Sequence, residues 1–346
     1  MTIKKPSPFS KKIEPRKISS DKDPVTMGYL DTAPEYPRVI QPALPKLDPI
    51  GWAESNRDLT MTQLAQHGAV LFRGFNLPTR KEFEHFARAL CPNLYSDYGD
   101  LPKVGKIYEV TPYPPDKIIG FHNESSHMHR WPMRQFFYCE QPALGGGTTP
   151  VVDCRKVLAA LDPEIREALA SKGLRYTRNF IKGVDVPWSD FFGTEDRAEV
   201  ATYCKENNIS FAWKGAEDLM TWQECPGIVS HPTTGELLLF AQVQLHHIAF
   251  LDSEVRESLI RQYGLENLPR NVYFGDGSEI PFEWAHAIDT HYWKLSVEFA
   301  WQQGDVLLVD NMLVAHARQT FTPPRRMFVA MGEIMHEHEL ANASKR

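Results

Sequence analysis

Residues 304–331 read GDVLLVDNMLVAHARQTFTPPRRMFVAM, and this stretch is the strongest indication of the fold. Two apolar runs within it, DVLLVDN and RRMFVAM, have the length and composition of buried β-strands. Between them lie a tight Asp-Asn turn and the segment MLVAHARQTF, which carries His316. The sequence therefore predicts two core strands with a histidine between them along the chain.

Short strands and a few helices fill most of the chain before this stretch. Apolar residues at helical spacing predict helices over residues 59–68, 79–90, 155–171 with an interruption near Pro163, 195–207 and 278–294. Strands are predicted over residues 69–75 and 135–140 and, as a pair joined by a Thr-Gly turn, over 228–242. This pattern predicts a mainly β fold with flanking α-helices: a β-sandwich or jelly roll with the helices packed outside.

The first 50 residues are rich in proline and, up to about residue 25, in lysine. We expect residues 1–50 to form a flexible or extended lead. Residues 51–346 show no internal repeat and no natural boundary, so they are predicted to form a single domain. The chemical motifs described below lie far apart in the chain, and we expect lid insertions between residues 155 and 300.

The composition excludes several classes of protein. The 346-residue chain is 42% hydrophobic and 24% charged, as in ordinary soluble proteins, and its net charge of −6 argues against a nucleic-acid partner. It contains no apolar run long enough to cross a membrane, and no apolar secretory signal follows its N-terminal residues, so we expect a cytoplasmic protein. The cysteines are scattered, as expected of reduced, buried thiols: Cys91, Cys139, Cys154, Cys204 and Cys225.

A second stretch, FHNESSH at residues 121–127, carries candidate metal ligands. On a strand, His122 and Glu124 would share one face, because side chains alternate with a period of two. With His316 as a third ligand, they would form two histidines and one carboxylate. This set is the facial triad of non-haem Fe(II) oxygenases, which leaves three positions on iron for a co-substrate and O2.

An arginine ten residues after His316 fits the same chemistry. The far carboxylate of 2-oxoglutarate needs a fixed bidentate partner, which the guanidinium of Arg326 would provide. The hydroxyl of Thr149, or alternatively that of Thr148, would complete this part of the site.

Several segments together resemble the TauD/TfdA-type Fe(II)/2-oxoglutarate dioxygenases, and within them the syringomycin-biosynthesis-type hydroxylases. The segments are GAVLFRGF, FHNESS with FFYC after it, GGGTTPVVDCR, HPTTGE and WQQGDVLLVDNMLVAHARQTFTPPRRMFVAM, spread over about residues 60 to 335. The resemblance implies a double-stranded β-helix of the clavaminate synthase-like type. It also implies that His122, Glu124 and His316 bind Fe(II), and that Arg326 and Thr149 bind 2-oxoglutarate, with O2 as the second co-substrate.

The implied activity is hydroxylation, epoxidation or desaturation of a small amino-acid-like substrate in antibiotic-type secondary metabolism. The substrate would be free or carried as an aminoacyl thioester on a carrier protein. Glu124 stands where most relatives have Asp, and a carboxylate there argues against a halogenase. Relatives that oxidise taurine have a second arginine four residues after the co-substrate arginine. Here that position is Ala330, which argues against an alkylsulfonate substrate.

Three further residues are candidates for contact with the substrate: Arg325, Arg318 and His127. Two other functions fit parts of the pattern. The same His2Glu set serves in zinc hydrolases, although the chain has no HExxH motif. A catalytically inactive binding protein on this fold is the second alternative, although inactive copies usually lose a ligand and all three are present here.

Overall fold

The computed structural model describes residues 23–33, 35–95, 103–104, 107–110, 113–181, 183–215 and 218–343. Its largest sheet has the strand order β1-β2-β3-β16-β7-β19-β5-β4. The strands are β1 (Val25–Gly28), β2 (Arg38–Pro42), β3 (Ala69–Phe72), β16 (Val306–Asp310), β7 (Arg130–Gln141), β19 (Arg326–His336), β5 (Ile107–Glu109) and β4 (Lys103–Val104). Neighbouring strands are antiparallel except β2 and β3, which are parallel.

A smaller sheet has the order β6-β17-β9. It consists of β6 (Ile119–His122), β17 (Val314–Arg318) and β9 (Val151–Asp153). A separate two-stranded pair is formed by β8 (Gly145–Gly146), which precedes β9 in the sequence, and β18 (Phe321–Thr322), which follows β17. Side chains from both sheets belong to one buried cluster, in which Phe137 and Val329 of the large sheet join Phe121 and Ala315 of the small one. This two-layer arrangement is a jelly roll, as predicted.

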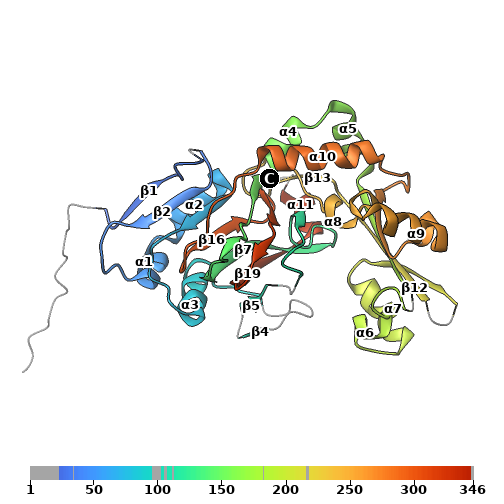
Figure 1. The fold of residues 1–346 in the computed structure, drawn as a ribbon, viewed down its shortest axis with the longest axis horizontal. Coiled ribbons are helices and arrows are strands. Elements are labelled where there is room, and N and C mark those ends of the chain that lie inside the picture. Colours follow the sequence, from blue (N-terminus) through green and yellow to red (C-terminus); the bar gives the residue numbers. More distant parts are fainter. Residues whose placement is uncertain are drawn as a thin grey trace, which may run out of the picture.

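Helices α1 (Pro49–Ser55), α2 (Arg57–His67) and α3 (Arg80–Leu90) lie beside the large sheet (Figure 1). Phe83 and Phe86 of α3 are fully buried, and Phe86 packs edge-on against Phe72 at a centroid distance of 5.0 Å. The ends of these helices follow local signals. The hydroxyl of Thr79 accepts a hydrogen bond from the Glu82 amide, and Gly68 closes α2 in the left-handed conformation with φ 73°.

A four-stranded antiparallel sheet, of order β11-β12-β10-β15, lies at the opposite end of the molecule from β1 and β2 (Figure 1). Its strands are β11 (Ser210–Lys214), β12 (Asp218–Cys225), β10 (Leu174–Phe180) and β15 (Arg270–Phe274). The remaining elements are α4 (Cys154–Ala160), α5 (Pro163–Lys172), α6 (Trp188–Phe192), α7 (Arg197–Glu206), β13 (Ile228–Ser230), β14 (Leu237–Leu239), α8 (Val243–His246), α9 (Ser253–Tyr263), α10 (Phe282–Leu295), α11 (Glu337–Ala343) and the 3-10 turns Ile248–Phe250 and Leu265–Asn267.

The predicted helices and strands are all present, with ends that differ by a few residues. The prediction of a separate lead over residues 1–50 is wrong for its described part. Strands β1 and β2 join the large sheet, and Val39 and Ile40 are buried in it, so the domain begins well before residue 51. The prolines that flank β2 concealed this short strand, because proline usually signals irregular structure. Residues 1–22 of the predicted lead lie outside the described residues.

All five cysteines are buried and free, as expected. In the described part of the chain, no helix combines the length and the apolar composition that crossing a membrane requires.

Candidate metal centre and its cavity

Two neighbouring side chains, His122 and Glu124, meet the distant His316 at the end of β6. One ligand atom from each of His122, Glu124 and His316 lies within 4.8 Å of the other two. Strand pairing explains the meeting, because His316 of β17 stands directly opposite His122 of β6, with their ring centroids 4.2 Å apart. The sequence prediction named these same three residues, and the structure places them together.

Both imidazoles are prepared to bind a cation. Nδ1 of His122 donates a hydrogen bond to the carbonyl oxygen of Gly120 at 2.9 Å, which leaves Nε2 unprotonated. Burial lowers the pKa of His316 well below its ordinary value, so this ring is neutral at pH 7. Its buried Nδ1 finds no hydrogen-bond partner in the described structure. Two imidazoles and a carboxylate within a few ångströms of one another suit a divalent metal.

The prediction that His122 and Glu124 share one face of a strand is wrong. Strand β6 ends at His122, and Glu124 lies in the turn that follows, so strand alternation does not orient it. Asn311 orients it instead. The side-chain oxygen of Asn311 accepts a hydrogen bond from the Glu124 amide at 2.7 Å, and its side-chain nitrogen donates to the Glu124 carbonyl at 2.9 Å. Both backbone groups of the carboxylate ligand are therefore fixed by one buried amide.

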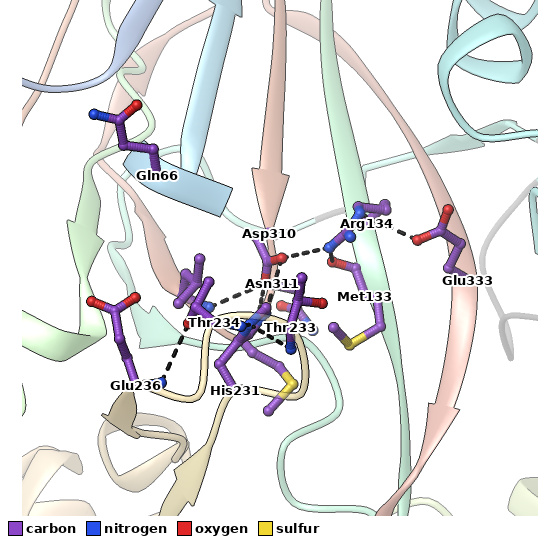
Figure 2. Close-up of polar contacts among 12 residues, drawn as sticks. Gln66, Met133, Arg134, His231, Thr233, Thr234, Glu236, Asp310, Asn311 and Glu333 are labelled. Carbon is purple, nitrogen blue, oxygen red and sulfur yellow. Dashed lines mark hydrogen bonds and ion pairs between the residues drawn. The ribbon is translucent and has the colours of Figure 1, made fainter. Parts of the chain in front are cut away.

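A buried polar network holds Asn311 in place (Figure 2). The neighbouring Asp310 accepts hydrogen bonds from Arg134 and from His231 Nε2, the latter at 3.2 Å. Nδ1 of His231 accepts from the amides of Thr233 and Thr234, which fixes the tautomer that donates to Asp310. Burial by itself would raise the pKa of Asp310, but Arg134 and His231 hold it below its ordinary value. The HPTTGE segment thus supports the turn that orients Glu124.

A cavity of about 990 Å³ opens onto the three candidate ligands. Arg325 and Thr149 line it. Arg325 donates to the carbonyl of Gly147 at 3.1 Å and to the Thr149 hydroxyl at 3.4 Å, and the Trp301 indole also donates to that hydroxyl at 3.2 Å. Burial, with a smaller contribution from the like charge of Arg318, lowers the pKa of Arg325 to about 10. A partly buried guanidinium of this kind is suited to an anionic ligand.

The prediction that Arg326 faces the site is wrong. Its side chain is 49% exposed and forms an ion pair with Glu140 at 3.2 Å, outside the cavity. Arg325 occupies the place that the sequence analysis gave to Arg326, because successive residues of an extended chain point to opposite faces. The pairing of β19 with β7 also shifts register immediately after Arg326, so counting along the strand does not reveal this face. Thr148 donates to Glu298 at 2.7 Å and does not line the cavity, which favours Thr149.

Comparisons with known proteins agree with this geometry. Residues 41–331 match the family described as "Taurine catabolism dioxygenase TauD, TfdA family". The chain belongs to this family.

Its relatives include the dapdiamide synthesis protein DdaC of Enterobacter agglomerans, which is 37% identical over 272 residues, 78% of this chain and 83% of that protein. A clavaminate synthase-like protein of Arabidopsis thaliana is 29% identical over 285 residues, 78% of this chain and 82% of that one. Among solved structures, PvcB of Pseudomonas aeruginosa is 13% identical with a TM-score of 0.56, covering 92% of this chain and 95% of its own; this likeness shows a shared fold. This TauD/TfdA family member is a dioxygenase.

The two remaining candidate residues of this dioxygenase line the same cavity. Arg318 donates three hydrogen bonds to backbone carbonyls, those of Tyr113 at 3.0 Å, Pro114 at 2.6 Å and Lys117 at 2.6 Å. It therefore anchors the segment before β6. The His127 ring lies 5.0 Å from that of His246, and its Nδ1 is buried with no hydrogen-bond partner among the described residues. His127 remains a candidate for substrate contact.

We expect the stability of the apoprotein to fall between pH 7 and pH 5. Burial, followed by the charge of Arg270, lowers the pKa of His127 to about 4. His127 gains a proton near pH 6.5 in the unfolded chain but only near pH 4 in the folded chain. The free energy of unfolding therefore falls by about 1–2 kcal/mol between pH 7 and pH 5. Urea unfolding at both pH values measures the loss. The His127→Asn variant should show a smaller pH dependence, and an identical one would contradict this role of His127.

Sequence analysis missed several residues around the centre. Asn311 and Gln135 both act on Glu124; the side-chain nitrogen of Gln135 donates to the Glu124 carboxylate at 3.4 Å. Gln242 donates to the carbonyl of Asn123 at 2.7 Å and thereby holds the same turn from the other side. Gln135 is a polar residue within the apolar strand β7, Asn311 follows β16 in a turn, and Gln242 precedes α8. Such polarity does not reveal the hydrogen-bond partner.

Replacing Asn311 with alanine is expected to weaken Fe(II) binding tenfold or more, because it frees the backbone of Glu124. Loss of groups that orient metal ligands typically costs about 10–100-fold in affinity. The dissociation constant can be measured by competition with a fluorescent chelator. Asn179→Ala is the matched control, since Asn179 is also buried and donates to a backbone carbonyl, that of Leu268, at 2.8 Å. Equal affinities in the two variants would assign Asn311 a purely structural role.

Proposed function

We propose that His122, Glu124 and His316 hold Fe(II) and that Arg325 and Thr149 hold the far carboxylate of 2-oxoglutarate. The single observation that supports this most strongly is the shared cavity. The three candidate ligands, which lie within 4.8 Å of one another, line the same cavity as the partly buried cation Arg325. A keto acid that chelates a metal at one end and needs a guanidinium at the other fits this pairing.

Bound Fe(II), with 2-oxoglutarate and O2, supplies an oxidant that removes a hydrogen atom from a substrate carbon. The residues of the chain position the reactants. Arg325 fixes the co-substrate with its charge, while the Thr149 hydroxyl holds the guanidinium in its orientation. Phe137 packs edge-on against the His316 ring at a centroid distance of 4.8 Å and keeps that side of the centre apolar. Such walls exclude water and stray donors from the reacting carbon.

The substrate is a small amino-acid-like molecule, and we place its oxidation in secondary metabolism of the peptide-antibiotic type. The similarity to a dapdiamide synthesis protein supports this placement. Hydroxylation, epoxidation and desaturation all begin with the same positioning of the substrate. The substrate is either free or tethered to a carrier protein. The enzyme is cytoplasmic in this proposal, which agrees with the net charge of the chain.

An alkylsulfonate substrate is not expected when Arg325, rather than Arg326, holds the co-substrate. Ala330 is fully buried in the cluster beneath α3 and does not line the cavity. Four residues after Arg325 stands Val329, which does line it. An apolar side chain at this place offers nothing to a sulfonate, so taurine is not expected to be the substrate.

Anaerobic titration of the protein with Fe(II) and 2-oxoglutarate tests the proposal. Chelation of the keto acid by iron is expected to produce a weak visible charge-transfer band. A zinc hydrolase or an inactive binding protein would give none. Absence of the band in protein that has bound iron would refute this function and restore both alternatives.

A further inference from the structure

The basic side chains that line the cavity among the described residues are Arg270, Arg318 and Arg325. Arg318 is occupied by three backbone carbonyls, and Arg325 is assigned above to 2-oxoglutarate. Arg270 is left without an assigned anion. It stands at the start of β15, and its side chain is 50% exposed at the mouth of the cavity. It also lines a smaller adjoining cavity of about 110 Å³.

The position of Arg270 destabilises the sheet that contains β10 and β15. Its direct partner across β10 and β15 is Arg178, and like charges in such opposed positions destabilise a sheet. The single negative charge of Asp185 can neutralise only one of these two positive charges. Its carboxylate accepts hydrogen bonds from Arg178 at 2.8 and 3.2 Å, whereas its contact with Arg270 is 3.8 Å long. This cluster of two arginines and one aspartate therefore keeps a net positive charge at the cavity mouth.

Neutral histidines continue the cavity wall from Arg270 towards the candidate metal ligands. His127 and His246 line both cavities together with Arg270. Burial lowers the pKa of each ring, and the charge of Arg270 lowers it further. These rings add hydrogen-bonding capacity without a competing charge, so the positive charge in this part of the cavity is concentrated on Arg270.

We propose that Arg270 is the subsite for a free carboxylate of the primary substrate, with His127 beside it as a neutral hydrogen-bonding partner. This inference rests on the proposed oxygenase function and names the chemistry of its substrate. A carboxylate suits a single available guanidinium, to which it binds through two parallel hydrogen bonds. A dianion such as a phosphate monoester suits it poorly, because Asp185 lies 3.8 Å away. A simple amino acid tethered through its carboxyl group as a thioester has lost this charge and would not use the subsite.

Binding experiments can test this without turnover. The protein is loaded with Zn(II) in place of iron and with 2-oxoglutarate. Calorimetry then measures the binding of the twenty proteinogenic L-amino acids and of the matched α-carboxamide of each. We expect at least one free acid to bind at least tenfold more tightly than its amide. Arg270→Gln should weaken the acid about tenfold or more, leave the amide within about twofold, and so remove the discrimination.

Matched variants separate recognition from stability. Arg261→Gln changes an exposed arginine of α9 and should leave both affinities unchanged. Arg270→Lys, which keeps the charge but not the bidentate geometry, should restore part of the preference for the acid. Because Arg270 faces Arg178, its replacement by glutamine should not lower the thermal midpoint, whereas a structural role would lower it.

Three results would overturn the subsite: equal binding of acids and amides, unchanged discrimination in Arg270→Gln, or no binding by any free acid in the set. The anaerobic band with Fe(II) and 2-oxoglutarate is recorded for the wild type and for Arg270→Gln alongside. If both show the band while discrimination fails, only the subsite is wrong. If the wild type lacks the band, the oxygenase assignment fails first.

Discussion

Replacing Arg325 with glutamine is expected to raise the dissociation constant of 2-oxoglutarate at least about 100-fold, equivalent to about 2.7 kcal/mol. The guanidinium is partly buried, forms no ion pair among the described residues, and is held by Gly147 and Thr149 towards the cavity. Charge-assisted, bidentate hydrogen bonds to a carboxylate are among the strongest polar contacts in proteins, and glutamine supplies neither the charge nor the fork. Anaerobic titration of the Fe(II)-loaded variant with 2-oxoglutarate measures the change.

The adjacent arginine provides the matched control. Arg326 carries the same charge one residue away, but it pairs with Glu140 at the surface. Exposed ion pairs contribute little, so Arg326→Gln should bind 2-oxoglutarate within about twofold of the wild type. The reverse result, with Arg326→Gln losing 2-oxoglutarate and Arg325→Gln keeping it, would show that the structure orients the two side chains wrongly.

Replacing His316 with alanine is expected to abolish tight Fe(II) binding and, with it, the visible band formed with 2-oxoglutarate. The variant loses one of the three candidate ligands, so only His122 and Glu124 of the described cluster remain. Loss of groups that merely orient ligands costs about 10–100-fold, so loss of a ligand itself should cost more. Chelator competition gives the affinity, and anaerobic spectroscopy gives the band.

A buried histidine away from the candidate ligands controls for damage to the fold. His247 is buried and is absent from the cluster of candidate ligands. Its Nε2 donates a hydrogen bond to the carbonyl oxygen of Ile280 at 3.0 Å, and its Nδ1 accepts one from the Ala249 amide at 3.1 Å. His247→Ala should lower stability while keeping iron and the band. Full retention of Fe(II) affinity by His316→Ala would remove His316 from the proposed centre, whatever its effect on stability.

The sequence by itself determined the local structure and the types of residue in the centre. Helix ends followed from Thr79 and Gly68, because caps act within one turn of the chain. Apolar runs predicted the core strands β3, β7 and β16, since burial requires such composition. The candidate ligands His122, Glu124 and His316 could be named from residue type and motif, and the structure brings them together.

Only the tertiary structure decided how these residues face one another. The direction of Arg325 and Arg326 depends on strand register at a shifted pairing, which is set by contacts with β7 rather than by neighbours in the chain. Glu124 is oriented by Asn311, a residue far along the chain, through hydrogen bonds that no local pattern encodes. Arg270 likewise reaches the cavity only because β15 pairs with β10. Local propensity acts over a few residues, whereas a site is assembled from long-range packing, and this difference sets the limit of sequence-based prediction here.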